Sequence, residues 1–291
     1  MNKKLTSKLA ITATGLAIAI FTFGNCKGKS ASETLRVAGS DTMVQMMQVM
    51  SKEYMKANPE KKVSVQGGGS GTGIAALING STDIANASRT MKDKEWKLLK
   101  DKGMKVTEHV VALDMLAVIV NPGSGVSKLT IEQLSDIFTG KITNWKEVGG
   151  KDAPILAISR ENNSGTHVYF KEKVVRKGDK TSEAEYGKEI TFAVSSQQII
   201  DQIKSNENAI AYVGMGWLTN EVKTVSIKND ANGSYFLPSK KNSGKGQYPL
   251  GRTLQIYVNE AAVDKNEPFL KFIESEAGQS VVQQLGFIPG K

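Results

Sequence analysis

Four short stretches rich in serine, threonine and glycine carry the residues of this 291-residue chain that are best suited to chemistry. They are GSDTM (39–43), GGGSGTG (67–73), NASR (86–89) and SRENNSGT (159–166). In each, a strand pattern ends and the turn follows, and a helical pattern usually begins after it. The start of a helix presents unpaired backbone N–H groups and the positive end of the helix dipole, and hydroxyl groups add donors without bulk. These loops therefore suit an oxyanion.

Two arginines strengthen this interpretation. Arg89 and Arg160 end or begin two of the loops, and a guanidinium group offers a planar fork that matches two oxygens of a tetrahedral anion. Any single loop is more often a plain helix cap, because serine and threonine are preferred N-cap residues. Four loops of one layout, two of them with arginine, favour an anion site over four unrelated caps.

An enzymatic alternative would make Ser164 a nucleophile with His167 as its base. Such a triad needs an orienting carboxylate, which the sequence around His167 does not offer, and Ser164 follows two asparagines instead of standing in a Gly-x-Ser-x-Gly elbow. We therefore expect His167 to be a capping or surface residue. His109, which lies within a strand pattern, is expected to be structural.

A methionine-rich stretch raises the alternative of a copper site. Met43, Met46, Met47 and Met50 could gather thioethers for Cu(I), but the same spacing buries one face of a helix, and no His or Cys accompanies them. We expect these side chains in the core. The sequence has no zinc-ligand spacing, paired-carboxylate signature or Walker loop, so we expect no metal and no cofactor.

The N-terminus has the features of an export signal. Three lysines precede an uncharged apolar run at 9–24, which is shorter than the about 20 residues of a membrane span and typical of a signal peptide, here 1–25. Cys26, the only cysteine, follows directly and begins a polar tether, 26–33. A lone cysteine at this place resembles the lipid-attachment site of a bacterial lipoprotein; the alternative is an incidental small residue near a cleavage site. We expect an exported protein, periplasmic or at the cell surface, with a lipid anchor in the membrane.

Length and composition constrain the architecture and the ligand class of the mature chain. Removing 1–25 takes away three lysines and no acidic residue, so the formal net charge falls from +9 to +6. The remainder is too long for one small core and suits two lobes, and without a second cysteine it forms no internal disulfide. A mild positive charge fits an anionic ligand. Export and the lack of a basic cluster interleaved with aromatic residues argue against nucleic acid.

Strand and helix patterns alternate through the mature chain. The strand patterns are 34–39, 61–66, 82–89, 106–121, 153–160, 209–214 and 253–259. Helical patterns follow several of them, and the pairs Thr130–Gln133 and Ser195–Gln198 have the spacing of a capping box. This alternation predicts α/β layers.

The order of the motifs resembles that of the phosphate-binding proteins of bacterial phosphate ABC importers. The motifs are AGSDTM, GGGSGTG, DIANASR, FTGKITNWKEVGG, SRENNSGT, YPLGRTL and GQSVVQQLGFIP, and they span essentially the whole mature chain. Arg-x-x-x-Ser-Gly-Thr and Lys-Ile-Thr-Asn-Trp are the most specific. The resemblance implies an α/β, two-lobed periplasmic-binding-protein fold of type II, with a mixed sheet flanked by helices in each lobe and two crossing hinge strands.

The resemblance also implies a function. Inorganic phosphate would bind in the cleft between the lobes and be delivered to an ABC permease, by a monomer without catalytic activity. Lobe I would be 34–115 with 253–291, and lobe II would be 116–252. We expect a hinge motion at two crossings, near 113–118 and 249–254.

The family's ligand contacts can be carried over to the four loops. They predict phosphate contacts at Ser40, Thr42, Met43, Ser70, Gly71, Ser88, Arg89, Arg160, Ser164, Gly165 and Thr166, with Met43 and Gly71 acting through the backbone.

The third loop departs from the longer family members, which have an aspartate where this chain has Arg89. Phosphate keeps a proton at neutral pH and sulfate does not, so a buried carboxylate acceptor would favour phosphate over sulfate. Asp41, next to Thr42, is the nearest candidate. Our hypothesis is that Asp41 either accepts the phosphate proton or pairs with Arg89.

Two alternatives stay open, because function resides in the site and not in the fold. The first is a binding protein for another oxyanion, such as sulfate, molybdate or tungstate. The second is a secreted phosphatase that uses Ser164.

Overall fold

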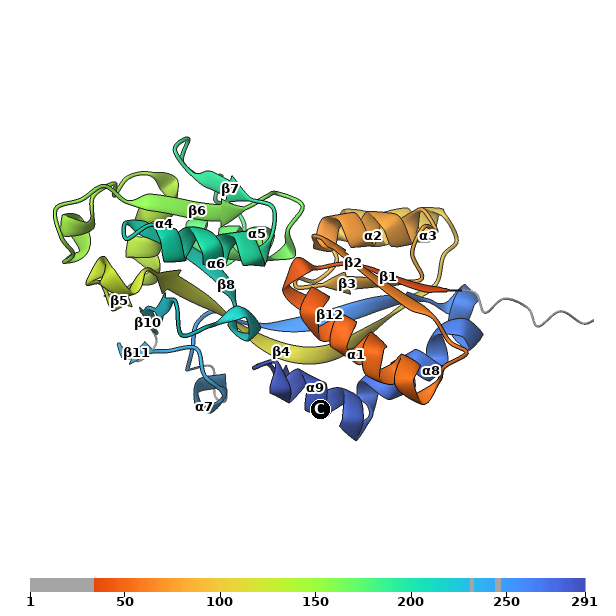
Figure 1. Cartoon of the computed structure of the whole chain (residues 1–291). Helices are drawn as coiled ribbons and strands as arrows, with labels where there is room; N and C mark the ends of the chain where they lie inside the picture. Colours follow the sequence, from red (N-terminus) through yellow and green to blue (C-terminus); the bar gives the residue numbers. More distant parts are fainter. Residues whose placement is uncertain (1–33, 231–232, 244–246, 291) are drawn as a thin grey trace, which may run out of the picture. The chain divides into compact units, whose positions relative to one another are not determined.

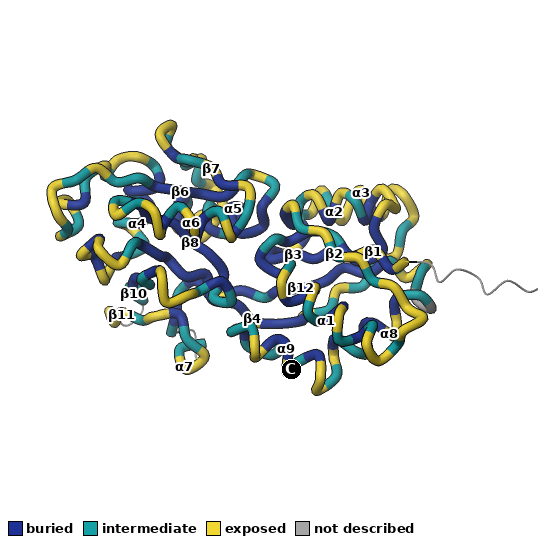
Figure 2. Tube along the Cα trace, viewed as in Figure 1, coloured by how far each residue is buried: buried dark blue, intermediate teal, exposed yellow. Residues whose placement is uncertain are grey.

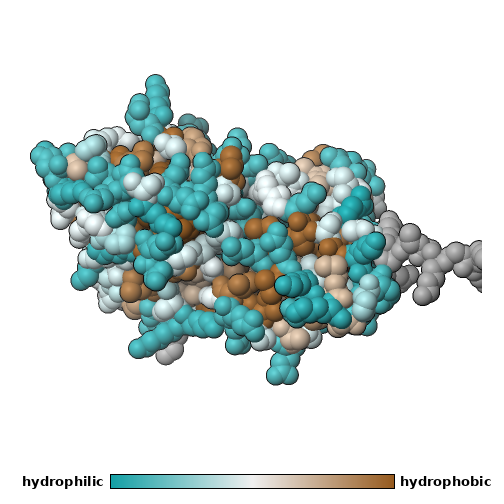
Figure 3. Space-filling model, viewed as in Figure 1, coloured by the Kyte–Doolittle hydropathy of each residue, from teal (hydrophilic) through white to brown (hydrophobic). Residues whose placement is uncertain are grey.

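The structure, a computed structural model, describes residues 34–230, 233–243 and 247–290 (Figure 1). The expected signal peptide, the tether and Cys26 lie outside these residues. Within the described ranges, no helix is long and apolar enough to cross a membrane, and no group of three His, Cys, Asp or Glu residues could hold a metal ion. On the face that Figure 3 shows, apolar residues form scattered patches among hydrophilic ones.

The described residues form one long mixed sheet and a small second one. The main sheet has ten strands, in the order β2-β1-β3-β12-β4-β8-β6-β7, with β9 and β13 also paired to β4; β5, β10 and β11 form the small sheet. The strands are β1 Leu35–Gly39, β2 Val63–Gly68, β3 Ile84–Ala87, β4 Val106–Val120, β5 Lys128–Leu129, β6 Leu156–Arg160, β7 Thr191–Ala193, β8 Ala209–Gly214, β9 Lys223–Thr224, β10 Ser226–Lys228, β11 Tyr235–Phe236, β12 Gly251–Asn259 and β13 Ile288–Pro289.

Helices cover the sheet on both faces (Figure 1). They are α1 Val44–Ala57, α2 Ser70–Ile78, α3 Asp93–Asp101, α4 Ile131–Thr139, α5 Gly165–Phe170, α6 Ser196–Ser205, α7 Lys240–Ser243, α8 Val263–Glu274 and α9 Glu276–Gln284. Short 3-10 turns are η1 Asp41–Met43, η2 Pro122–Ser124, η3 Trp145–Val148, η5 Met215–Trp217 and η7 Glu260–Ala262, and η4 Lys171–Val175 is a π-helical extension of α5.

The long strand β4 divides the main sheet into two segments. From Val106 to Met115 it pairs with β12, and from Leu116 to Val120 it pairs with β8. We call β2, β1, β3, β12 and the first part of β4 the first sheet segment, and the last part of β4 with β8, β6 and β7 the second sheet segment. Both expected crossings, 113–118 and 249–254, lie where β4 changes partner and β12 begins.

The core has separate layers on the two faces of the first sheet segment, and buried chain also runs through the second segment (Figure 2). Helices α1, α8 and α9 cover one face, and α2 with α3 covers the other. Met43, Met46, Met47 and Met50 are all fully buried in the first of these layers. The prediction that the methionine stripe is core is confirmed.

The predicted strands are found in the structure, and one of the two predicted capping boxes is formed. All seven predicted strand segments contain a strand, and Thr130 with Gln133 forms a capping box at the start of α4. The second box is incomplete: Ser195 Oγ accepts a hydrogen bond from the Gln198 N–H, but the Gln198 side chain accepts from the Val194 N–H instead of returning to Ser195. The sequence spacing alone does not distinguish these two arrangements.

Candidate functional site

The four serine- and threonine-rich loops meet in the structure, although up to 124 positions separate their residues. Thr42 Oγ1 and Thr166 Oγ1 lie 2.8 Å apart, and Ser70 Oγ lies 3.3 Å from Ser88 Oγ. The Ser88 N–H also donates to Ser70 Oγ at 3.0 Å. Both hydroxyl pairs are buried. The residues of the four loops are thus close together in the structure, which a shared site requires.

Two glycines allow this close approach. At Gly39, which ends β1 with a φ of +137°, an added Cβ would lie 2.3 Å from the Asn86 backbone oxygen. At Gly165, an added Cβ would lie 2.3 Å from Ser70 Oγ and 2.7 Å from Ser88 Oγ. Any side chain at Gly165 would therefore push the fourth loop away from the second and third loops.

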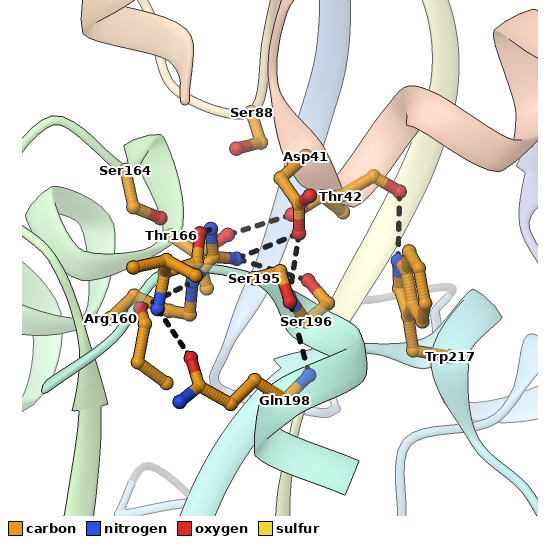
Figure 4. Close-up of polar contacts among 12 residues, drawn as sticks. Asp41, Thr42, Ser88, Arg160, Ser164, Thr166, Ser195, Ser196, Gln198 and Trp217 are labelled. Atoms are coloured by element: carbon orange, nitrogen blue, oxygen red, sulfur yellow. Dashed lines mark hydrogen bonds and ion pairs between the residues drawn. The ribbon is translucent and has the colours of Figure 1, made fainter. Parts of the chain in front are cut away.

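Arg160 is the charged group at the centre of the site. It is 2% exposed, and its Nη1 donates to Asp41 Oδ2 at 3.1 Å and to Ser196 Oγ at 3.0 Å (Figure 4). Its other nitrogens donate to the backbone oxygens of Ala193 and Val194. Burial lowers the pKa of Arg160 and the charge of Asp41 opposes this effect. The guanidinium is thus fixed in position and carries its own counterion.

Asp41 connects the two sheet segments. Its Oδ2 also accepts from the Ser196 N–H at 2.6 Å, at the first turn of α6. Asp41 Oδ1 lies beside Gly67 and has no hydrogen-bond partner among the described residues. One carboxylate oxygen thus holds Arg160 and α6, and the other remains open to a donor.

Arg89 differs from the expectation. Its two terminal nitrogens donate to Glu95 Oε2 and Oε1 at 2.8 and 2.7 Å, so the fork is taken by a carboxylate of α3. Burial alone would raise the pKa of Glu95, but the hydrogen bonds from Arg89 and from the Lys92 N–H bring it below its usual value. Pairing of Arg89 with Asp41, one of our two alternatives for Asp41, is wrong, since each has another ionic partner.

Ser164 and His167 do not form a nucleophile–base pair. Ser164 is the N-cap of α5, where its Oγ accepts from the His167 backbone N–H at 3.4 Å. The His167 ring bonds through Nδ1 to the Arg160 backbone oxygen at 2.6 Å and to Ser159 Oγ at 3.2 Å. Burial lowers the pKa of His167 to about 4, so the ring is neutral at pH 7. The expectation that His167 is a capping or surface residue is wrong: it is 6% exposed, and its ring holds the backbone of Arg160.

His109 lies away from these loops. Its ring contacts Glu274 and Thr107, so it is a structural residue as expected.

Sequence reasoning missed an ion pair next to the site. Arg252 of β12 donates through Nε and Nη2 to Asp114 Oδ2 of β4, at 2.9 and 2.8 Å. Its Nη1 reaches Thr166 Oγ1 at 3.1 Å and the Ser88 backbone oxygen at 3.2 Å. A signal was available: Asp114 is a lone carboxylate in the apolar stretch VVALDMLAVIV, and a buried charge needs a partner.

Trp217 and Ser196 were also missed. The Trp217 indole N–H donates to the Thr42 backbone oxygen at 3.1 Å, and Ser196 contacts both Arg160 and Asp41. Neither residue carries a sequence signal for this role, because each reaches the site from an element that is distant in the sequence.

The arrangement is suited to binding an oxyanion. Hydroxyl groups of Thr42, Ser70, Ser88, Ser164 and Thr166 are buried together beside an arginine, and Ser40 Oγ is buried without a partner in the described part of the chain. Buried donors need acceptors, and an anion with several oxygens supplies them.

Comparison with known proteins gives consistent matches along the chain. A protein-family model described as a PBP superfamily domain matches residues 27–277. The phosphate-binding protein PstS of Pseudomonas aeruginosa is 31% identical over 280 residues, which cover 90% of this chain and 85% of that protein. The PstS of Bacillus subtilis is 33% identical over 267 residues, covering 91% and 84%.

Comparison with solved structures also gives matches to substrate-binding proteins of ABC transporters. A putative phosphate ABC transporter substrate-binding protein from Clostridium perfringens, solved with bound phosphate, has a TM-score of 0.78 and 31% identity, covering 89% of this chain and 100% of that chain. The substrate-binding domain of a putative molybdenum ABC transporter from Clostridium difficile has a TM-score of 0.52 at 18% identity, covering 89% and 99%. The second likeness concerns the fold alone.

Proposed function

Because this chain belongs to the PBP superfamily and, within it, to the PstS-type phosphate-binding proteins, we propose that it binds inorganic phosphate and delivers it to an ABC permease. The resemblance that the motif order indicated is confirmed by these relatives, as is the two-lobed periplasmic-binding-protein fold. The observation that carries the proposal is the convergence of four hydroxyl-rich loops beside the buried Arg160.

The cleft would lie between two lobes that correspond to the two sheet segments. We assign 34–115 with 253–291 to lobe I and 116–252 to lobe II. The change of partner within β4, from β12 to β8, supports a boundary at this point. Closure would bend β4 and β12 near 113–118 and 249–254 and bring the loops of both lobes around the ligand.

Phosphate would be held mainly by hydroxyl and backbone donors. We assign these contacts to Ser40, Thr42, Met43, Ser70, Gly71, Ser88, Ser164, Gly165 and Thr166, with Met43 and Gly71 acting through the backbone, and we place Arg160 at the anion as its charged partner. Arg89, whose fork is held by Glu95, would support the third loop instead of touching the ligand. Such a set of donors is consistent with a dissociation constant near micromolar, about −8 kcal/mol, or tighter.

Asp41 would supply the selectivity. Its Oδ2 is fixed by Arg160 and Ser196, and its Oδ1 is open among the described residues, so it can accept the proton that phosphate retains and sulfate lacks. For sulfate, the same oxygen would face an anion without a proton between them, which is unfavourable in a buried site.

Calorimetry tests this function. The protein, freed of ligand by unfolding and refolding, would be titrated with phosphate, sulfate and molybdate in separate experiments. We expect one phosphate to bind per chain, with sulfate and molybdate silent. Binding of molybdate or sulfate in place of phosphate would contradict the proposal and support a protein for another oxyanion.

We propose no catalytic activity. The neutral His167 bonded to the Arg160 backbone supports this, because it leaves Ser164 without a base. Incubation with a chromogenic phosphate ester should release no more product than buffer does. Hydrolysis that disappears in Ser164→Ala while phosphate binding persists would establish the phosphatase alternative.

We further propose export, cleavage after residue 25 and attachment of lipid to Cys26, with the protein acting as a monomer at the membrane surface. The support is the N-terminal sequence pattern. Growth of the producing bacterium with labelled palmitate should label the protein, and Cys26→Ser should remove the label. A label that persists in Cys26→Ser would contradict the anchor.

A further inference from the structure

Asp114 and Arg252 form an ion pair at the point where the two long strands cross. They are directly opposite each other in the register of β4 and β12. Asp114 is 1% exposed and Arg252 is 8% exposed, and the Tyr169 ring lies 5.5 Å from the guanidinium carbon, which shields it further. Burying two charges is costly, so such a pair does not by itself indicate a gain in stability.

Every polar atom of the pair has a defined partner. Two guanidinium nitrogens hold Asp114 Oδ2, and Asp114 Oδ1 accepts from the Met215 N–H at 2.8 Å, just after β8. The remaining nitrogen, Nη1, donates to Ser88 and to Thr166. The hinge pair therefore contacts the third loop and the fourth loop with a single nitrogen.

The contact with Thr166 constrains a hydroxyl group of the proposed site. A guanidinium group donates hydrogen bonds and accepts none, so Arg252 fills a lone pair of Thr166 Oγ1 and the hydroxyl proton must point elsewhere. Thr42 Oγ1 lies 2.8 Å away on another side. Whichever threonine donates to the other, one proton of the pair remains, and an oxyanion oxygen is the acceptor that suits it.

We propose that Arg252, held by Asp114, is a positioning residue that orients the hydroxyl pair of Thr166 and Thr42 so that its one remaining proton is a donor to the bound oxyanion. This inference rests on the proposed phosphate site. The line of contacts runs from Asp114 at the hinge through Arg252 to Thr166 at the start of α5 and to Thr42 at η1. Since Thr166 and Thr42 belong to opposite sheet segments, the line is complete only when the segments are together.

Arg252→Lys separates positioning from simple charge neutralisation. A lysine keeps the positive charge beside Asp114, so the variant should fold, but one ammonium group cannot hold Asp114 and also reproduce the forked contacts with Ser88 and Thr166. We expect phosphate affinity to fall about 10- to 100-fold, as is typical for hydrogen bonds that involve a charged group. If Arg252→Lys binds phosphate like the wild type, the fork is not needed and the inference is wrong.

A double-mutant cycle tests the connection itself. The hydrogen bonds that connect Arg252 with Thr42 run through Thr166. The effects of Arg252→Lys and Thr42→Val on phosphate affinity should therefore be less than additive, by at least about threefold. In a Thr166→Val background, Arg252→Lys should add less than about threefold. Additive effects in the first cycle would show that Arg252 does not act through Thr166.

Tyr248→Phe is the matched control. The Tyr248 hydroxyl donates to the Leu116 backbone oxygen at 2.8 Å, at the same crossing but away from the loops. The Tyr248→Phe substitution should lower the melting temperature and leave phosphate affinity within about twofold of the wild-type value. A loss of affinity in Tyr248→Phe equal to that in Arg252→Lys would mean that any weakening of the hinge is sufficient, which would also overturn the inference.

A failure of the proposed function and a failure of this inference would give different binding results. If the wild type does not bind phosphate, the proposed function fails and this inference falls with it. If the wild type binds phosphate and Thr166→Val weakens binding, but Arg252→Lys does not, only the role of Arg252 is refuted.

Discussion

Replacing Asp41 with asparagine would test the basis of selectivity. The substitution keeps the shape of the side chain and an oxygen that can accept from the Ser196 N–H, but it removes the negative charge beside Arg160. It also places an amide, which has donors of its own, where the open oxygen Oδ1 stands. Phosphate would lose its charged acceptor, and sulfate would no longer meet an unpaired carboxylate.

The expected losses of stability and of phosphate affinity follow from the burial of Arg160 and Asp41. Arg160 is 2% exposed and the Asp41 side chain is 12% exposed, so Arg160 would lose a counterion in a nearly dry site. Complete removal of one partner of a buried pair costs about 3–5 kcal/mol, and the retained oxygen of asparagine should reduce this to about 1–3 kcal/mol in the ligand-free protein. A hydrogen bond to a charged acceptor is worth about 1.5–3 kcal/mol, so phosphate affinity should fall about 10- to 100-fold.

The assay is calorimetry of the wild type and of Asp41→Asn with phosphate and with sulfate, together with thermal unfolding of both proteins. We expect weaker phosphate binding, measurable sulfate binding and a lower melting temperature. Ser196→Ala removes one hydrogen bond of Arg160 while keeping the carboxylate, so it should lower stability without admitting sulfate. A lower melting temperature in Asp41→Asn with phosphate affinity and sulfate rejection unchanged would show that Asp41 only stabilises the fold.

Three further substitutions give distinct expected results. Gly165→Ala would place a Cβ 2.3 Å from Ser70 Oγ, and the displaced loop should weaken phosphate binding about 10- to 100-fold in calorimetry; unchanged binding would exclude close packing of these loops. Burial lowers the pKa of His167 from 6.5 to about 4, so the unfolded chain binds more protons between these values and stability falls as the pH drops from 6.5 towards 4. Urea unfolding at pH 7 and at pH 4 should show this fall in the free energy of unfolding, about 3 kcal/mol, in the wild type and not in His167→Gln. An equal fall in both proteins would assign it to other titratable groups. Glu95→Gln should cost about 1–3 kcal/mol of stability in thermal unfolding and leave the phosphate dissociation constant within about threefold, whereas a large gain in affinity would make Arg89 a ligand contact.

The loops could be predicted because their signal is local. A strand pattern followed by serine, threonine and glycine specifies a turn and a helix start whatever surrounds it, as in GGGSGTG before α2. The meeting of Thr42 with Thr166 and of Ser70 with Ser88 then required only that the strands share one sheet. Residue types and order were sufficient for this part of the site.

The partners of the charged groups could not be predicted in the same way. Which carboxylate reaches Arg89 depends on how α3 turns back over the end of β3, and Glu95 lies on its first turn. Asp41 was considered as a partner because it stands next to Thr42 in the first loop, and its pairing with Arg89 is wrong. Likewise the pairing of Asp114 with Arg252, which are 138 positions apart, follows from the register of β4 and β12. Long-range register is set by packing of the whole sheet, and short motifs do not encode it.

The pairing of every buried arginine changes the physical basis of binding. Arg89, Arg160 and Arg252 are the buried arginines of the described residues, and each has a carboxylate partner within hydrogen-bond distance. The site therefore does not attract phosphate through excess positive charge, as two arginines near hydroxyl-rich loops first suggested. It offers hydroxyl and backbone donors that contacts between the loops already hold in place, which lowers the cost of ordering them around a ligand. A site of this kind discriminates between oxyanions by the number and protonation of their oxygens more than by their charge, because one misplaced proton leaves a buried group unpaired. In the function proposed above, selectivity and neutrality are two consequences of the carboxylate of Asp41, which pairs with Arg160.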